Sequence, residues 1–336
     1  ACLVGSEMCI RGRLKFAASV DAKLLEIPSG TNGRGLREAG VLPNAAPGYA
    51  EPARCGRSAA EVAAAVAAGD IHALYLVELD PLRELPNRGL WEQALHHASL
   101  VVAHASMLTE GLKEHADVVF PAESHAEKEG TMIHPDGRVQ RLRAAIGHPD
   151  EVRPGWWVVA EICKSVGLDT GVLTSAMAFA QLVEAVPFYA GLTLNELGGQ
   201  GVRWPEVVGS NWRYTAETSQ TPPTTQGARS PTQDAPKNGA LLLGRYRPIW
   251  ADPAVEISPA LHYTIARQQV ELSPEDAQRL GIASGDAVAV SQNGTSLSGT
   301  AQVRSGVPPG TAFLAEGIAS DSANAFTEST VEVCKK

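Results

Sequence analysis

The sequence predicts an α/β protein in which a Rossmann-like parallel sheet, covered by helices, precedes a small β-barrel. Strand-sized apolar runs alternate with helical stretches between residues 58 and 165, the order typical of a parallel sheet with helices on its faces. Residues 214–240 contain almost no large apolar side chains, and short strands separated by turns follow them. The 336 residues, of which 44% are hydrophobic, are enough for roughly two domains.

Composition excludes several classes of function. A formal charge of −9 and a pI near 5.5 argue against a nucleic-acid-binding protein, which normally presents a basic face, and against a polybasic membrane anchor. No apolar run approaches the ~20 residues of a membrane helix, so we expect no direct membrane insertion. The five cysteines form no CxxC pair, so no zinc or iron–sulfur site is predicted in this chain.

Because the sequence begins with Ala1 and lacks a signal-peptide pattern, we expect its first domain to be truncated at the N-terminus.

The first predicted elements have clear boundaries. Residues 58–69 predict a helix, because a serine can cap its start, a glutamate three residues later completes a capping box and Gly69 ends it. Residues 72–79 have the length and content of a buried strand, which Asp80 ends together with the following proline.

Two more helix–strand pairs continue this alternation. The helices are expected at 89–98 and 107–116, and the strands at 99–105 and 117–122. Ligands of parallel sheets bind beyond the carboxyl ends of the strands. Asp80 and the loop 121–131 both follow such ends, so we expect them on one rim of a sheet within residues 58–165. The sequence therefore predicts a binding loop there, with a Gly-Thr pair and an Asp-Gly-Arg turn close behind it.

The remaining chain predicts two helices, a linker and the barrel. Helical patterns occupy residues 155–167 and 175–186. The barrel is predicted from a strand pattern between 269 and 317, which includes an Asn-Gly hairpin turn. We expect three parts in chain order: an α/β domain at 1–212, a flexible linker at 213–240 and the barrel at 241–336.

Motifs for catalysis are missing from the sequence. The Gly-rich stretch at 30–35 does not complete a dinucleotide fingerprint, because Glu38 stands where the third glycine should be. His125 with Glu123 and Glu127 has the donors for a metal, although a solvated charge run is the simpler interpretation. No G-x-S-x-G elbow occurs. From its motifs alone, the sequence therefore predicts no catalytic or metal-binding residue.

Taken in order, these segments resemble the molybdopterin oxidoreductase superfamily, and within it most closely the C-terminal half of the G-subunit family of NADH-quinone oxidoreductase (respiratory complex I). The likeness covers roughly residues 24–165 and 255–334. A strand like 116–122 is followed in the family by a glutamate, a Gly-Thr pair and a Gly-Arg turn. The corresponding residues here are Glu127, Gly130, Thr131, Gly137 and Arg138, followed by Gln140.

The resemblance implies a double-psi β-barrel at the C-terminus and positions for a pterin guanine dinucleotide on the rim. The implied cofactor-binding positions are Asp80, Glu127, Gly130, Thr131, His134 and Arg138. The family often has Asn where His134 stands, and Asp136 replaces a glutamate. Acidic side chains near the loop would also repel a pyrophosphate. We therefore expect a vestigial pocket, with molybdopterin guanine dinucleotide bound only under the catalytic alternative below.

The function that the resemblance implies is a scaffold region without a complete active site, in a subunit that supports electron transfer from NADH to quinone. Iron–sulfur clusters are expected in a preceding part of the subunit, and no metal is expected in this chain. The expected partners are other subunits of the complex I peripheral arm, at the cytoplasmic face of the cell membrane. Two alternatives stay open: the cofactor-binding half of a formate-dehydrogenase-like molybdopterin enzyme, and a non-enzymatic small-molecule binding or interaction module.

Overall fold

The computed structural model describes residues 20–21, 30–204 and 239–336, which belong to two compact units. Unit 1 comprises Ala1–Ala59 and Pro121–Ser230, and unit 2 comprises Ala60–Phe120 and Pro231–Lys336. These units do not follow the order of domains expected along the chain, and the expected domain bounds stay a prediction. Apart from its last two residues, the predicted linker at 213–240 lies outside the described residues.

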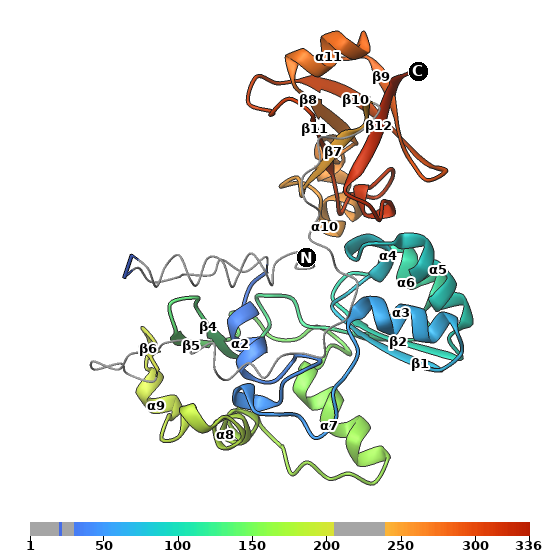
Figure 1. Ribbon diagram of the computed structural model, residues 1–336. Coiled ribbons are helices and arrows are strands. Elements are labelled where there is room, and N and C mark those ends of the chain that lie inside the picture. Colours follow the sequence, from blue (N-terminus) through green and yellow to red (C-terminus); the bar gives the residue numbers. More distant parts are fainter. Residues whose placement is uncertain (1–19, 22–29, 205–238) are drawn as a thin grey trace. The chain divides into compact units, whose positions relative to one another are not determined.

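Unit 2 contains a three-stranded sheet in the order β1-β2-β3 (Figure 1). Strands β1 and β2 are parallel, with Ala73 opposite Leu100 and Val77 opposite His104. The predicted alternation of helices and strands and the parallel sheet are therefore confirmed. The elements are α3 (Ala59–Ala67), β1 (Ala73–Val77), α4 (Pro81–Glu84), α5 (Arg88–His97), β2 (Leu100–Ala105), α6 (Glu110–His115) and β3 (Val118–Pro121).

One face of this sheet carries the core of the α/β part. Alternate strand residues point to the same side, so Leu74 and Leu76 of β1 share a face with their β2 partners Val101 and Ala103. All four are buried and pack against apolar side chains from the helices. The helical partners are Ala63 and Val66 of α3, Leu82 of α4, Trp91, Ala94 and Leu95 of α5, and Leu112 of α6.

The second part of unit 2 is a closed six-stranded barrel in the order β10-β8-β11-β7-β12-β9. Its strands are β7 (Leu241–Tyr246), β8 (Gln269–Leu272), β9 (Ala287–Gln292), β10 (Thr295–Val303), β11 (Thr311–Ala315) and β12 (Thr330–Lys335). Its helices are α10 (Pro253–Ile257), η4 (Pro259–Thr264), α11 (Pro274–Leu280) and η5 (Ala323–Ala325). Asn293 and Gly294 both have positive φ, 48° and 85°, as the predicted hairpin turn requires. The barrel prediction is confirmed, and its double-psi topology stays a prediction.

Unit 1 combines short helices with an antiparallel sheet in the order β4-β5-β6. Its strands are β4 (Gly130–Ile133), β5 (Arg138–Leu142) and β6 (Val202–Arg203). Its helices are α2 (Gly33–Glu38), η1 (Pro47–Tyr49), α7 (Gly155–Ser165), α8 (Ser175–Ala185), η2 (Pro187–Tyr189) and α9 (Leu194–Leu197). Ile133 and Val139 of the hairpin pack with Phe179, Val186, Tyr189, Leu192 and Leu197.

The expectation of one parallel sheet throughout residues 58–165 is wrong at its C-terminal end. Residues 130–142 form the antiparallel hairpin β4-β5, with Ile133 opposite Val139. The physical reason is the Asp136-Gly137 turn: Gly137 has φ 90°, which allows the chain to reverse its direction there. The Gly-Thr pair consequently lies in a strand and not in an open loop.

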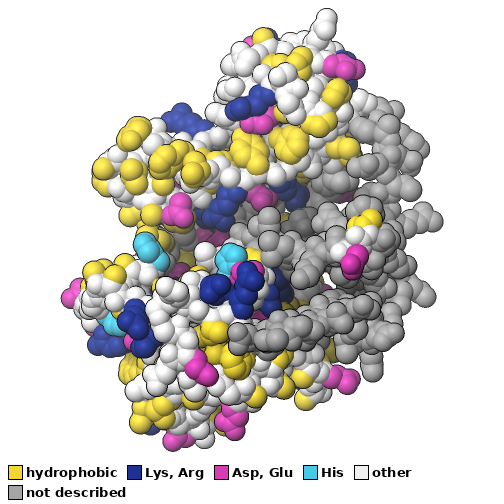
Figure 2. Space-filling view, turned by 90° about the vertical axis from the view of Figure 1, so that its left-hand side faces the viewer, with side chains coloured by type: hydrophobic (Ala, Val, Ile, Leu, Met, Phe, Trp, Pro, Cys, Tyr) yellow, Lys and Arg dark blue, Asp and Glu magenta, His cyan; other side chains and the backbone are white. Residues whose placement is uncertain are grey.

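Among the helices of the described residues, none is long and apolar enough to cross a membrane. Hydrophobic side chains do reach the surface, and Figure 2 shows them as several separate groups.

Candidate functional site

Asp80 lies beyond the carboxyl end of β1 and is 5% exposed. Its Oδ1 accepts a hydrogen bond from the backbone N–H of Leu82 at 3.0 Å, which caps α4. Its Oδ2 accepts one from the Thr109 hydroxyl at 2.6 Å. A Cβ at Gly111 would lie 2.8 Å from both carboxylate oxygens, so a larger residue there would displace the Asp80 side chain. The predicted rim position is therefore used to hold the starts of α4 and α6 together.

A second carboxylate at the same strand end is also used within the protein. Glu78 has φ 50°, an uncommon conformation for a residue other than glycine. Its N–H donates to the carbonyl of His104 at 2.8 Å. Its side chain accepts hydrogen bonds from the hydroxyl and backbone N–H of Ser106, at 2.9 and 3.3 Å. The strained backbone thus directs Glu78 towards the end of β2.

Polar side chains also join α4 to the barrel within unit 2. Both terminal nitrogens of Arg83 donate to the carboxylate of Glu256, at 2.9 and 2.6 Å. The Asn324 amide donates to the carbonyls of Leu82 and Leu85, at 2.9 and 3.1 Å. Sequence reasoning missed the Arg83–Glu256 pair, because 173 residues separate its members and no local pattern marks them.

This junction contains two buried atoms without hydrogen-bond partners among the described residues. They are Nε of Arg83, a donor, and Oδ1 of Asn324, an acceptor. Buried polar atoms are normally paired with protein or ordered water. The junction therefore has the capacity for one donor and one acceptor contact beyond those that the protein supplies.

The hairpin β4-β5 separates the candidate residues of unit 1. Gly130 and Thr131 begin β4, whereas His134 stands at the turn, and its N–H donates to the carbonyl of Arg138 at 2.9 Å. Four residues of strand span about 13 Å, so the Gly-Thr pair and Arg138 do not meet at one small group. A Cβ at Gly130 would meet nothing within 4 Å, so packing does not require glycine at this position.

The charges at the hairpin turn satisfy one another. Asp136 pairs with His134 at 2.8 Å and with Arg203 of β6 at 2.7 Å, and it accepts the backbone N–H of Arg138 at 3.0 Å. Burial raises the pKa of Asp136, but the hydrogen bonds from His134 and Arg203 outweigh it and hold the pKa well below its usual range. The Arg138 guanidinium donates to the carbonyl of Gly201 at 3.3 Å.

The acidic stretch before the hairpin is not a solvated charge run, so that interpretation is wrong for two of its carboxylates. Glu127 is 9% exposed and accepts the backbone N–H of Ser124 at 2.9 Å. Glu123 is 6% exposed; it pairs with His148 at 2.7 Å and accepts the N–H of Gly155, the first residue of α7, at 3.2 Å. Within the described part of the chain, no group of three or more His, Cys, Asp or Glu is placed to hold a metal.

The Gly-rich segment at 30–35 supports the hairpin. Asn32 accepts the N–H of Ile133 at 2.9 Å, and Arg34 donates to the carbonyl of Pro135 at 2.7 Å. Arg34 also pairs with the buried Glu38 at 2.7 Å, and Glu38 accepts the hydroxyl of the buried Tyr189. Burial, followed by the Glu38 carboxylate, raises the pKa of Tyr189 far above its usual value. These contacts tie the Gly-rich segment to the β4-β5 hairpin and to η2.

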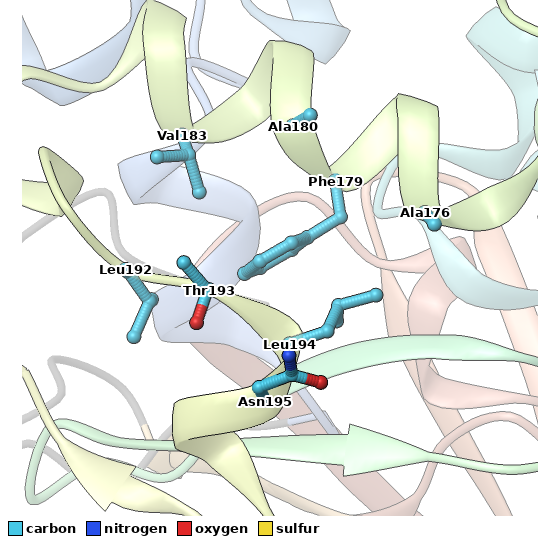
Figure 3. A pocket seen from close by; sticks show the side chains of 8 residues that line it. All are labelled: Ala176, Phe179, Ala180, Val183, Leu192, Thr193, Leu194 and Asn195. Atoms are coloured by element: carbon cyan, nitrogen blue, oxygen red, sulfur yellow. The ribbon is translucent and has the colours of Figure 1, made fainter.

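A shallow pocket of about 320 Å³ lies elsewhere in unit 1 (Figure 3). Side chains from α8, from the segment before α9 and from α9 itself line it. They are Ala176, Phe179, Ala180, Val183, Leu192, Thr193, Leu194 and Asn195. None of the six predicted cofactor-binding residues is among them, so this pocket is unrelated to the predicted site.

Two family models match the chain in the order that the fold suggests. Residues 14–165 match the model of molybdopterin oxidoreductases, and residues 253–336 match that of the molydopterin dinucleotide binding domain. The chain therefore contains a segment of a molybdopterin oxidoreductase domain and a molydopterin dinucleotide binding domain. The matched segments agree with those on which the resemblance was based.

Several curated proteins are similar to this chain. The NADPH-Fe(3+) oxidoreductase subunit alpha of Geobacter sulfurreducens is 28% identical, over 84% of this chain and 33% of the relative. The F420-dependent formate dehydrogenase 2 subunit alpha of Methanococcus maripaludis is 26% identical, over 91% of this chain and 49% of the relative. The second NADH-quinone oxidoreductase G subunit of Rhizobium meliloti is 29% identical, over 74% of this chain and 28% of the relative. The chain thus spans between about a quarter and half of the length of these relatives.

A solved structure supports the fold as a whole. Acetylene hydratase from Pelobacter acetylenicus matches with a TM-score of 0.58 at 15% identity, over 84% of this chain and 47% of that chain. Of the six predicted positions, Gly130, Thr131, His134 and Arg138 lie along the β4-β5 hairpin of unit 1, Glu127 precedes this hairpin, and Asp80 belongs to unit 2. The carboxylates of Asp80 and Glu127 already accept hydrogen bonds from protein groups.

Proposed function

We propose that this chain is the scaffold region of a G subunit of NADH-quinone oxidoreductase. In this proposal it supports a part of the subunit that carries iron–sulfur clusters and passes electrons from NADH towards quinone. The main support for this proposal is that the predicted site residues make hydrogen bonds within the protein itself. Asp80, Glu127 and Arg138 are each hydrogen-bonded to protein groups that hold local structure together, and Asp136 neutralises the hairpin turn beside His134.

Electrostatics supports the same conclusion. A pyrophosphate needs positive groups or free N–H donors that converge on it. In unit 1, Arg203 and the N–H of Arg138 are both directed at Asp136. Arg141 faces Glu129 at 3.4 Å. These donors are therefore already engaged with carboxylates of the chain itself.

The proposal extends to partners and location. The subunit would assemble with other subunits of the complex I peripheral arm, at the cytoplasmic face of the cell membrane. The relative from Rhizobium meliloti is named as such a G subunit. In the scaffold role the chain contributes stable packing, and the chemistry lies in other parts of the complex.

A second function is favoured by the junction between α4 and the barrel. Arg83 Nε and Asn324 Oδ1 are buried there without partners among the described residues, and Asn324 lies within the segment that matches the dinucleotide binding domain. In this alternative the chain is the cofactor-binding half of a catalytic molybdopterin enzyme, where the cofactor supplies the redox chemistry. The orphan donor and acceptor would then contact the dinucleotide.

Cofactor content separates the two functions. The natural gene product that contains this chain is purified, and its iron, molybdenum, tungsten and released pterin are quantified per polypeptide. The scaffold proposal expects iron with essentially no molybdenum, tungsten or pterin. Stoichiometric pterin that is lost in Gly130→Trp but retained in the matched control Gly147→Trp would overturn it. A Cβ at either glycine would meet no heavy atom within 4 Å, so the two variants differ mainly in location.

A further inference from the structure

Two histidine rings meet at the surface of unit 2. His96 lies in the last turn of α5, and His115 is the last residue of α6. Their ring centres are 4.8 Å apart and their planes are nearly perpendicular, at 86°. His96 is exposed and His115 is half-buried, so both rings can reach solvent. The pair belongs neither to the predicted rim positions nor to the junction between α4 and the barrel.

The topology of the sheet explains why these two rings meet. Helix α5 leads into β2 and α6 leads into β3, and the two strands are neighbours in the order β1-β2-β3. Both helices pack on the same face of the sheet. Each helix ends just before its strand, so the two C-terminal turns lie together at the edge where the strands begin. Asp80, beyond the carboxyl end of β1, marks the opposite edge.

Both helix ends are held in place by the protein. Leu95 and Leu112, in the turns that carry the two rings, are buried in one core. Two residues beyond His115, the backbone N–H of Asp117 donates to the carbonyl of Val101 at 2.8 Å. The carboxylate of Asp117 accepts the N–H of the same valine at 2.7 Å. A ligand that needs both rings therefore finds them close together on fixed backbones.

The ring nitrogens of the pair are available for a ligand. No hydrogen bond or ion pair joins a nitrogen of His96 or His115 to another residue that the structure describes. A neutral imidazole keeps one nitrogen with a free lone pair, and imidazole suits Zn²⁺, Ni²⁺ and Cu²⁺. With Zn–N bonds of about 2.0–2.1 Å, two imidazoles on one ion have ring centres about 5 Å apart. The observed separation of 4.8 Å suits a shared ion.

We propose that His96 and His115 form a binding site for a divalent transition-metal ion such as Zn²⁺. Each ring supplies one nitrogen and water completes the coordination, because no third His, Cys, Asp or Glu among the described residues is placed to join them. The C-terminal ends of helices carry partial negative charge and favour a cation, and the formal charge of −9 acts in the same direction. The bound ion joins α5 to α6, and the site is independent of either function proposed above.

Zinc titration of single variants tests the proposal. The 336-residue chain, purified without a histidine tag, is titrated with Zn²⁺ by isothermal titration calorimetry. His96→Gln and His115→Gln should each weaken Zn²⁺ binding at this site by about tenfold or more. The matched control is His97→Gln, one residue further along α5, where Nδ1 donates to the carbonyl of Gln93 at 2.9 Å. This control should bind Zn²⁺ as the wild type does.

Thermal unfolding gives a second readout. Zn²⁺ should raise the thermal midpoint of the wild type and of His97→Gln, because the ion binds the folded pair better than two separated histidines. It should leave the midpoint of His96→Gln unchanged. Equal Zn²⁺ affinity in the wild type and in the double variant His96→Gln/His115→Gln would overturn the proposal. So would a loss of affinity in His97→Gln as large as that in His96→Gln, or a loss in His96→Gln that His115→Gln does not share.

Discussion

The ion pair between Arg83 and Glu256 should be the strongest single polar link between α4 and the barrel. It is bidentate, at 2.9 and 2.6 Å, and the side chains are 9% and 23% exposed. Breaking a fully buried pair costs about 3–5 kcal/mol, because one charge stays behind without a partner. Glu256 keeps some contact with water, so we expect Glu256→Ala to lower the free energy of unfolding by about 2–3 kcal/mol.

The expected loss of stability comes mainly from the Arg83 charge that stays buried without a partner, and only in part from the lost attraction between Arg83 and Glu256. Arg83→Met removes the charge and keeps much of the volume, so the double variant Arg83→Met/Glu256→Ala should regain about 1–2 kcal/mol relative to the sum of the single changes. The expected fall in the thermal midpoint for Glu256→Ala is about 5–10 °C for a unit of this size.

Urea unfolding followed by fluorescence provides the assay, since Trp91 is buried in the same unit. The surface pair Arg88–Glu92, at 2.8 Å with both side chains more than 40% exposed, serves as the matched control. Glu92→Ala should change stability by at most about 0.5 kcal/mol. The explanation would be contradicted if the stability losses of the single Arg83 and Glu256 variants simply added up in the double variant. It would also be contradicted if Glu256→Ala and Glu92→Ala lowered stability equally.

Three further predictions concern single side chains. Tyr189→Phe should lower stability by about 1–2 kcal/mol in urea unfolding, because Glu38 loses a buried donor; no change would show that the hydroxyl is dispensable. Gly137→Ala should lower the thermal midpoint, because φ at this position is 90° and a Cβ would lie 3.2 Å from the Arg34 guanidinium. As the control, Gly130→Ala should change stability by at most about 0.5 kcal/mol. Equal effects of the two variants would contradict this prediction. Burial raises the pKa of Asp276, but hydrogen bonds from a serine, an arginine and a backbone N–H lower it overall. Its stabilisation is therefore present above the ordinary pKa of 3.8 and is lost as pH falls below it, so Asp276→Asn should flatten the acid limb of stability against pH.

Much of the secondary structure follows from local sequence. The run ALYLV predicts a strand because it is short, apolar and ended by Asp80 and a proline, and β1 occupies Ala73–Val77. The Asn293-Gly294 turn predicts a hairpin because both positions need positive φ. The closed barrel follows from several such signals in succession. The resemblance to molybdopterin oxidoreductases, which the two family models also match, was accessible as well, because segments in a fixed order carry more information than any one motif.

The roles of the acidic residues were not accessible from sequence. Glu123 and Glu127 stand in a stretch of Lys, Glu and His that reads as solvated, yet both are buried. A carboxylate can be buried when it accepts directed hydrogen bonds. Its donors here are partly distant in sequence, such as Gly155 and His148 for Glu123.

Short-range signals were sufficient for the α/β and β-barrel parts, for the strand ends that place Asp80 at a rim, and for the family. Hydrophobic period, caps and turns act over a few residues, so they can be read directly from the chain. Tertiary packing, in contrast, joined Asp80 to Thr109 and brought Arg83 to Glu256 across 173 residues. Such pairings depend on which elements pack together, and the energy that selects them comes from burial and directed hydrogen bonds between distant parts of the chain.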